Sequence, residues 1–248
     1  MRFLLTAVLA AFPLFAWGGS LADVEVFDRT AGQALPLYQY QGQWYVAGEP
    51  GHRYELRIRS RASQRLLAVT SVDGVNVVSG ETAAVDQRGY VIDRWDSVEI
   101  EGWRKSLDEV ARFYFTALPD SYAARTGRPD NVGVIGIALF RELQPRPYCC
   151  KYLDRQRSDA ESPAGASGSP PEAARERSEP HLGTGHGEHE SSPAQYVDFR
   201  RASTTPDETV IIYYDSRRNL VAQGVLPAKP RMAQQRPEAF PNDFVPDP

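Results

Sequence analysis

The stretch Leu66–Val78, which reads LLAVTSVDGVNVV, decides the fold of this chain. Two runs rich in β-branched residues flank Asp73 and Gly74, and an Asp-Gly pair suits a type I′ turn because both central positions need a positive φ. The pattern therefore predicts a tight β-hairpin. Its predicted cross-strand pairs are Val72 with Val75, Ser71 with Asn76, and Val69 with Val78.

Further strands are predicted on both sides of this hairpin. Residues 54–59 alternate strictly, with Tyr54, Leu56 and Ile58 on one face and charged residues on the other, which is the period of a half-buried antiparallel strand. Residues 131–140 form a continuous apolar run with two glycines, which is typical of a strand buried on both faces. Shorter strands are predicted at 24–27, 44–46, 89–93, 97–102 and 113–116.

Helices are predicted in few places. Ser106 and Glu109 have the spacing of a capping box, so residues 107–112 fit a helix as well as they fit a strand. Asp120 can cap a short helix over 121–126, which Gly127 would end in a left-handed conformation.

The domain boundaries follow from a change in composition. Residues 142–181 are rich in Pro, Ser, Glu and Arg without periodicity, which predicts a disordered linker. Ordered structure is predicted to return in 182–227, where a strand at 209–214, a polar turn at 215–219 and a strand at 220–225 would form a second hairpin. Two strands are rarely stable alone. We therefore predict a mainly β protein, an antiparallel β-sandwich, in which 23–141 and 182–227 form one discontinuous domain.

The chain begins with the pattern of a secretory signal peptide over residues 1–22. Arg2 precedes an apolar run from Phe3 to Trp17, and Ser20 and Ala22 place small residues before a cleavage site at Asp23. The run is shorter than the roughly 20 residues that a membrane span needs. The mature protein is therefore expected to be periplasmic or secreted, with no stable membrane span.

The remaining composition excludes one class of partner. Arg2 is the only charged residue of the leader, so 27 basic and 32 acidic side chains follow it. This mildly acidic balance does not favour nucleic-acid binding, which usually needs a basic face. The two cysteines, Cys149 and Cys150, are adjacent, so they suit either a redox or intermolecular role or no structural role at all.

A His- and Gly-rich segment at 181–190 is the first candidate site. His181, His186, His189 and Glu188 could hold a divalent metal such as zinc on a flexible glycine loop. Their spacing matches no zinc template, so a solvated loop without a cofactor is the competing interpretation. No G-x-S-x-G elbow is present to indicate a serine nucleophile.

Two aromatic groups are the other candidates, both for ligand binding. Trp103 beside Arg104 could form a platform for a sugar ring or an acidic polymer, or Trp103 could instead cap the core. Trp44 and Tyr45 belong to an aromatic cluster that suits either a recognition surface or a sandwich core.

Seven strings together resemble a group of uncharacterised exported proteins of Gram-negative bacteria. The strings are YVAGEPGHRYELRIR, LLAVTSVDGVNVVSGETA, VEIEGWRKS, FYFTALPDSYAARTG, NVGVIGIALF, LGTGHGE and YYDSRRNLVAQGVLP. They cover most of 23–141 and 182–227, and 142–180 lies outside the resemblance. The resemblance implies an exported, β-rich protein and carries over no catalytic residue.

These observations favour an exported, non-catalytic binding or envelope-associated module whose partner is an unknown envelope component or a small ligand. The alternative is a metal-dependent hydrolase built on the segment at 181–190. In the Pro-rich tail at 228–248, Phe240 and Phe244 offer anchors that would dock on this protein or on a partner, or the tail is a free end.

Overall fold

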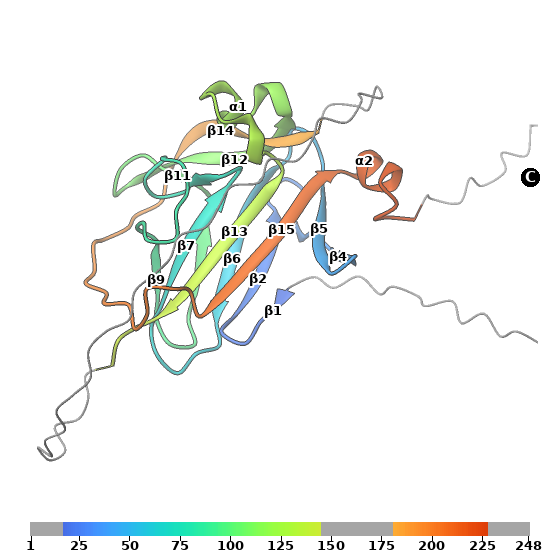
Figure 1. The fold of residues 1–248 in the computed structure, drawn as a ribbon. Coiled ribbons are helices and arrows are strands. Elements are labelled where there is room, and N and C mark those ends of the chain that lie inside the picture. The colour runs from blue at the N-terminus through green and yellow to red at the C-terminus, as the bar shows by residue number, and fades with distance from the viewer. Residues whose placement is uncertain (1–16, 145–180, 228–248) are drawn as a thin grey trace, which may run out of the picture.

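The computed structural model of the chain describes residues 17–144 and 181–227, which form two packed and mostly antiparallel β-sheets (Figure 1). Strands from both sides of the predicted linker enter each sheet, which confirms the antiparallel sandwich formed by one discontinuous domain. The predicted linker lies almost wholly outside the described residues, as do both cysteines and the tail anchors Phe240 and Phe244.

The first sheet contains eight strands. They are β1 (Trp17–Gly18), β2 (Ala22–Asp28), β3 (Gln33–Ala34), β6 (Arg53–Ser60), β10 (Ser97–Ile100), β11 (Gly102–Arg104), β12 (Glu109–Ala117) and β14 (Leu182–Ser191). Strand β12 settles the open question at 107–112 in favour of a strand from residue 109 onward.

The second sheet contains seven strands, in the order β4-β5-β15-β13-β7-β8, with β9 paired to β7. They are β4 (Leu37–Tyr40), β5 (Gln43–Gly48), β7 (Leu66–Val72), β8 (Val75–Asn76), β9 (Tyr90–Ile92), β13 (Val134–Arg141) and β15 (Glu208–Ser216). Strand β15 pairs antiparallel with β13 and parallel with β5, so the last of the described strands lies inside the sheet (Figure 1).

The described helices are short, and none is both long and apolar enough to cross a membrane. They are the 3-10 turns η1 (Leu118–Asp120) and η2 (Pro129–Asn131) and the α-helices α1 (Tyr122–Arg125) and α2 (Arg217–Ala222). Helix α1 is the predicted one, although Ser121 caps it in place of Asp120, through a bond from the amide of Ala124 to its hydroxyl. Gly127 follows it with a φ of +77°, as predicted.

The central hairpin is confirmed but is shorter than predicted. Ser71 pairs with Asn76 and Val72 with Val75, and the turn residues Asp73 and Gly74 have φ values of +54° and +70°. Strand β8 ends at Asn76 because its side-chain oxygen accepts the amides of residues 78 and 79, at 2.7 and 3.1 Å, and bends the chain away. The predicted pairing of Val69 with Val78 therefore does not form.

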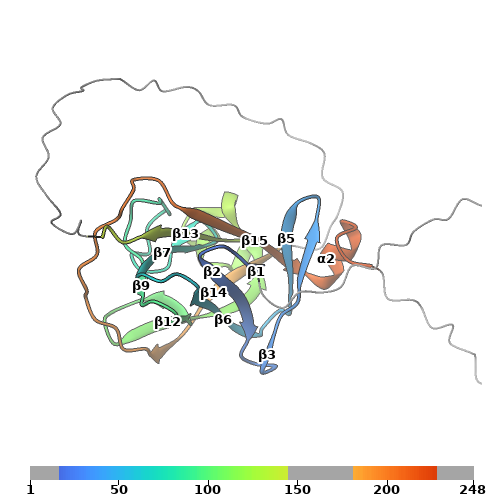
Figure 2. The same cartoon turned by 90° about the horizontal axis from the view of Figure 1, so that it is seen from below.

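The predicted second hairpin is wrong. After β15 the chain does not return as a strand over 220–225 but forms α2, which lies beyond β5 at one edge of the molecule (Figure 2). The cause is local: the Ser216 hydroxyl accepts the amide of Asn219, at 3.1 Å, and caps a helical turn. The sequence-based interpretation treated this capping pair as an ordinary polar turn.

The core fills the space between the sheets and is rich in aromatic side chains. Tyr54 of β6 is fully buried, and its ring stacks on Phe115 and Phe113 of β12 at centroid distances of 4.3 and 5.4 Å. Strand β13 is buried on both faces, as predicted, because Leu139 enters this core whereas Phe140 packs in a smaller cluster on the other side.

A buried polar cluster crosses the core beside these rings. One Asp73 carboxylate oxygen accepts the Tyr214 hydroxyl at 2.5 Å and the Gly133 amide at 2.9 Å, and the other accepts the Thr184 amide at 2.7 Å. The Thr184 hydroxyl in turn lies 2.6 Å from the hydroxyls of both Tyr54 and Tyr214. The cluster thus joins the hairpin turn to β6, β14 and β15.

Candidate functional site

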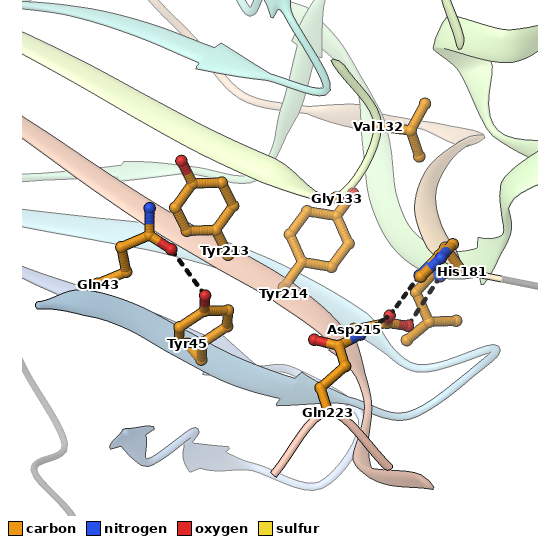
Figure 3. A pocket seen from close by; sticks show the side chains of 10 residues that line it. Gln43, Tyr45, Val132, Gly133, His181, Tyr213, Tyr214, Asp215 and Gln223 are labelled. Carbon is orange, nitrogen blue, oxygen red and sulfur yellow. Dashed lines mark hydrogen bonds and ion pairs between the residues drawn. The ribbon is translucent and has the colours of Figure 1, made fainter. Parts of the chain in front are cut away.

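A cavity of about 340 Å³ lies where β5 and β15 meet the start of β14 and helix α2 (Figure 3). Its walls combine three tyrosines, two glutamines and a histidine–aspartate pair with backbone near Gly133. We consider this cavity the candidate ligand site because it brings together aromatic and hydrogen-bonding groups from four distant parts of the chain.

The aromatic wall arises from strand register. Tyr45 of β5 and Tyr213 of β15 are direct partners in the parallel pair, so their side chains lie on the same face, with ring centroids 5.6 Å apart. The Tyr45 hydroxyl donates to the Gln43 side-chain oxygen at 2.7 Å. Burial, followed by the neighbouring Tyr213 and Tyr40, raises the pKa of Tyr45, so its phenol stays protonated at neutral pH.

Asp215 is the most tightly held group at the site. Its side chain is only 7% exposed and lies at the end of β15. One oxygen accepts the backbone amides of Leu182 and Ser216, at 3.1 and 2.7 Å, and the side-chain amide of Asn219, at 2.9 Å. These bonds connect β14, β15 and α2, so the carboxylate is fixed in position before any ligand arrives.

His181 takes its orientation from this carboxylate. Its Nδ1 lies 2.7 Å from the second oxygen of Asp215 (Figure 3), and because that oxygen is an acceptor, Nδ1 must donate. No described residue bonds to Nε2, and the side chain is 55% exposed. His181 therefore presents a defined ring nitrogen at the edge of the cavity.

The lining limits the chemistry of this site. Among the described residues it contains no Lys or Arg, so it lacks the cations that would hold a phosphate or carboxylate ligand. It also contains no Ser, Thr or Cys that could act as a nucleophile beside His181. The site is suited to holding an uncharged ligand that stacks on tyrosine and exchanges hydrogen bonds with amides and imidazole.

The predicted flexible loop at 181–190 is a strand. Residues 182–191 form β14, which pairs with β12 along its whole length, with a bulge between Ala111 and Phe113. The alternate glycines at 183, 185 and 187 face neighbouring chain instead of solvent. A Cβ on Gly185 would lie 2.1 Å from the ring of Tyr114, so the glycine is needed for that ring to cover the strand.

The strand separates His181 from the other proposed metal ligands, although the rings of His186 and His189 lie 6.3 Å apart. His181 bonds to Asp215, whereas His186 lies beside the rings of Trp103 and Tyr122, at centroid distances of 6.3 and 5.3 Å. Burial, with a contribution from Lys105, lowers the pKa of His186, so it is neutral at neutral pH.

The other two proposed ligands lie apart from His181 as well. The ring of His189 lies 3.4 Å from the Glu109 carboxylate, and Glu188 is exposed, 3.7 Å from Arg112. The described residues contain no group of three or more His, Cys, Asp or Glu side chains that could hold a metal ion. The geometry at 181–190 therefore gives the hydrolase alternative no metal centre.

The side chains of Trp103 and Arg104 both make contacts within the protein. Trp103 is 2% exposed and packs edge-to-face on Phe113 at 4.8 Å, so neither face of its ring is open to a sugar. The Arg104 guanidinium donates to the Tyr90 hydroxyl at 2.9 Å and to the backbone oxygen of Ser192. Arg104 thus holds the chain that follows β14 against the sandwich, while Trp103 fills the core.

The two candidates of the second aromatic group, Trp44 and Tyr45, lie in different places, one against the core and one in the cavity. Trp44 is half-buried and packs on the main core, whereas its neighbour Tyr45 points into the cavity (Figure 3). This follows from the alternation of a strand, in which adjacent side chains face opposite sides. Of the four ligand-binding candidates chosen from the sequence, only Tyr45 lines the cavity.

A second hollow of about 510 Å³ lies on the first sheet, beside Arg53, Arg112, Tyr114 and His186. Of its two cations, Arg112 already donates to Glu190 at 2.6 Å, and the carboxylate of Glu188 also lines the hollow. The charge of Arg112 is therefore paired within the protein, and we consider this hollow a weaker candidate.

Sequence reasoning missed Tyr213, Asp215 and the two glutamines of the site. Tyr213 and Asp215 are two residues apart on one strand, and this spacing places them on the same face. That signal was available, but only the pairing of β15 with β5 shows that Tyr45 lies beside it. No protein-family model, curated protein or solved structure matches this chain, so the site is interpreted from its own geometry.

Proposed function

We propose that this protein is an exported, non-catalytic binding module that holds a small neutral saccharide, free or as part of an envelope polymer. The leader pattern at 1–22 supports export. The observation that carries the binding proposal is the Tyr45–Tyr213 wall beside the fixed His181–Asp215 pair. Tyrosine rings stack on the C–H faces of sugars, while Gln43, Gln223 and His181 supply hydrogen-bonding groups for hydroxyls.

The absence of cations from the described lining favours a neutral over an anionic sugar. The absence of a described nucleophile beside His181 favours binding over hydrolysis. The fixed geometry of Asp215 also supports binding, because a pre-organised site loses less conformational entropy when its ligand arrives.

The test is a binding measurement with purified protein. A panel of neutral mono- and disaccharides, each matched with a phosphorylated or carboxylated counterpart, is titrated by calorimetry and by ligand-observed NMR. We expect binding of at least one neutral sugar, with weaker binding of its charged counterpart. Tyr213→Ala should weaken that binding by at least about tenfold, since a buried aromatic anchor contributes about 2 kcal/mol or more.

Tyr196→Ala is the matched control, because Tyr196 is 77% exposed and does not line the cavity. Equal losses for the two variants, or no binding by any neutral sugar, would contradict the proposal. Cleavage of a bound sugar by the wild type, abolished by His181→Ala, would contradict its non-catalytic part.

A further inference from the structure

The first residues of β2 and the residue before it belong to the core. Leu21 is 3% exposed and Ala22 is fully buried, and Ala22 pairs with Ser60. The Leu21 carbonyl accepts the amide of Arg61 at 2.7 Å. Gly18 and Ser20, in contrast, are exposed. The boundary between the exposed chain and the packed chain therefore lies between Ser20 and Leu21.

This boundary conflicts with the cleavage site predicted from the sequence. Cleavage before Asp23 would remove Leu21 and Ala22, both of which fill the sandwich. Small residues also stand two positions earlier, because Gly18 and Ser20 would occupy the −3 and −1 positions of a cut before Leu21. Both cuts satisfy the sequence pattern, but only the earlier one preserves the core.

Glu208 lies directly opposite this boundary. One of its carboxylate oxygens accepts the Leu21 amide at 2.8 Å and the Ser20 hydroxyl at 2.5 Å. The other oxygen is buried and has no hydrogen-bond partner among the described residues. No cationic side chain of the described residues pairs with Glu208 either. An unpartnered buried carboxylate oxygen is unfavourable, so a donor that reached this second oxygen would stabilise the fold.

We propose that the leader is removed between Ser20 and Leu21 and that the new α-ammonium of Leu21 pairs with Glu208. Hydrolysis of the Ser20–Leu21 peptide bond converts one amide N–H into an ammonium group with three donors and a positive charge. The ammonium nitrogen occupies the position of the present amide, 2.8 Å from the carboxylate, and its extra donors can reach the unpartnered oxygen. Strand β1 leaves with the leader. This inference rests on the proposed export.

The first experiment is to express the full chain in a Gram-negative host and to determine the N-terminus of the exported protein by intact mass and N-terminal sequencing. We expect the chain to begin at Leu21. A chain that begins at Asp23, or at any other residue, would overturn this inference and leave export intact. A full-length chain retained in the cytoplasm would overturn export and the cleavage together.

The second experiment measures the pairing without relying on export. Three forms are prepared by scarless tag removal: one beginning at Leu21, one beginning at Asp23, and one that keeps a single preceding residue as Ser20→Ala. We expect the Leu21 form to have the highest melting temperature, because the Asp23 form loses core residues and the extended form moves the charge away from Glu208.

Glu208→Gln should remove the difference between the Leu21 form and the extended form. Glu49→Gln, at an exposed glutamate, should leave that difference unchanged. An Asp23 form as stable as the Leu21 form would refute the structural boundary. A difference that persists in Glu208→Gln would refute the ammonium–carboxylate pair.

Discussion

Asp73 shows how one residue serves both a turn and a core. Its backbone has the positive φ that the hairpin turn needs, while its carboxylate accepts three hydrogen bonds inside the sandwich. Burial raises its pKa from 3.8 to about 6, against the opposing effect of the bonds from Tyr214, Thr184 and Gly133. The turn role was predicted from the Asp-Gly pair, but the buried cluster was not, because its other members lie far away in the sequence.

A pH dependence of stability follows from Asp73. The folded protein holds the proton more tightly than the unfolded chain, so the contribution of Asp73 to the free energy of unfolding falls as pH rises from about 4 to about 6. The fall should reach about 3 kcal/mol at most, at about 1.4 kcal/mol per pKa unit. Asp73→Asn does not titrate there, so the stability of the wild type relative to this variant should increase as pH falls through that range.

At neutral pH, Asp73→Asn should itself lower the free energy of unfolding by about 1–3 kcal/mol, because an amide NH₂ would face a backbone or hydroxyl donor. Urea titrations at several pH values measure both effects. Asp130→Asn, at an exposed aspartate, is the control and should change neither. A difference between wild type and Asp73→Asn that stays constant from pH 4 to pH 7 would contradict the raised pKa.

At the scale of elements, the sequence predicted those strands whose formation depends mainly on residues close together in the chain. Three predicted segments became strands: the alternating residues 54–59, the first arm of the Asp-Gly hairpin, and the apolar run at 131–140. In each segment the pattern of apolar residues matches the faces of the sheet that are buried. Strand β14 was missed, because glycine is usually unfavourable in a strand and the cover for these glycines comes from distant residues, such as the ring of Tyr114 from β12 over Gly185. The candidate site was predicted only at Tyr45 and His181, whose partners Tyr213 and Asp215 are brought to them by sheet pairing and packing.

The glycine at 185 gives a direct test of this explanation. Gly185→Ala would place a Cβ 2.1 Å from the Tyr114 ring, so it should lower the free energy of unfolding by about 1–3 kcal/mol through overpacking. In a Tyr114→Ala background the same substitution should cost much less, and denaturant unfolding of the four proteins measures the coupling. Losses that simply add would show that Tyr114 is not the reason for the glycine.

At the scale of the whole molecule, the two described segments depend on each other. Strand β14 completes the first sheet against β12, and β15 lies between β5 and β13 in the second. Neither segment contains a finished sheet or a closed core. Each part therefore lacks the apolar cover that would make it stable alone.

Co-expression of two separate chains tests this dependence. Residues 1–144 and 181–248 should co-purify as a folded pair, because the contacts between them are those of a single core. Each chain expressed alone should be insoluble or unfolded by circular dichroism. A soluble and cooperatively unfolding 1–144 chain would show that the first segment is a domain in its own right.

The position of β15 also determines when the second sheet can form during synthesis of the chain. Strand β15, the last described strand to be synthesised, lies between β5 and β13, so neither of these strands can pair with it until residue 216 has left the ribosome. Pairings between such distant segments form slowly, because the entropy of closing a long loop is lost before any stabilising contact forms. We therefore expect the growing polypeptide to stay open throughout translation, which is the state that a translocation pore can thread.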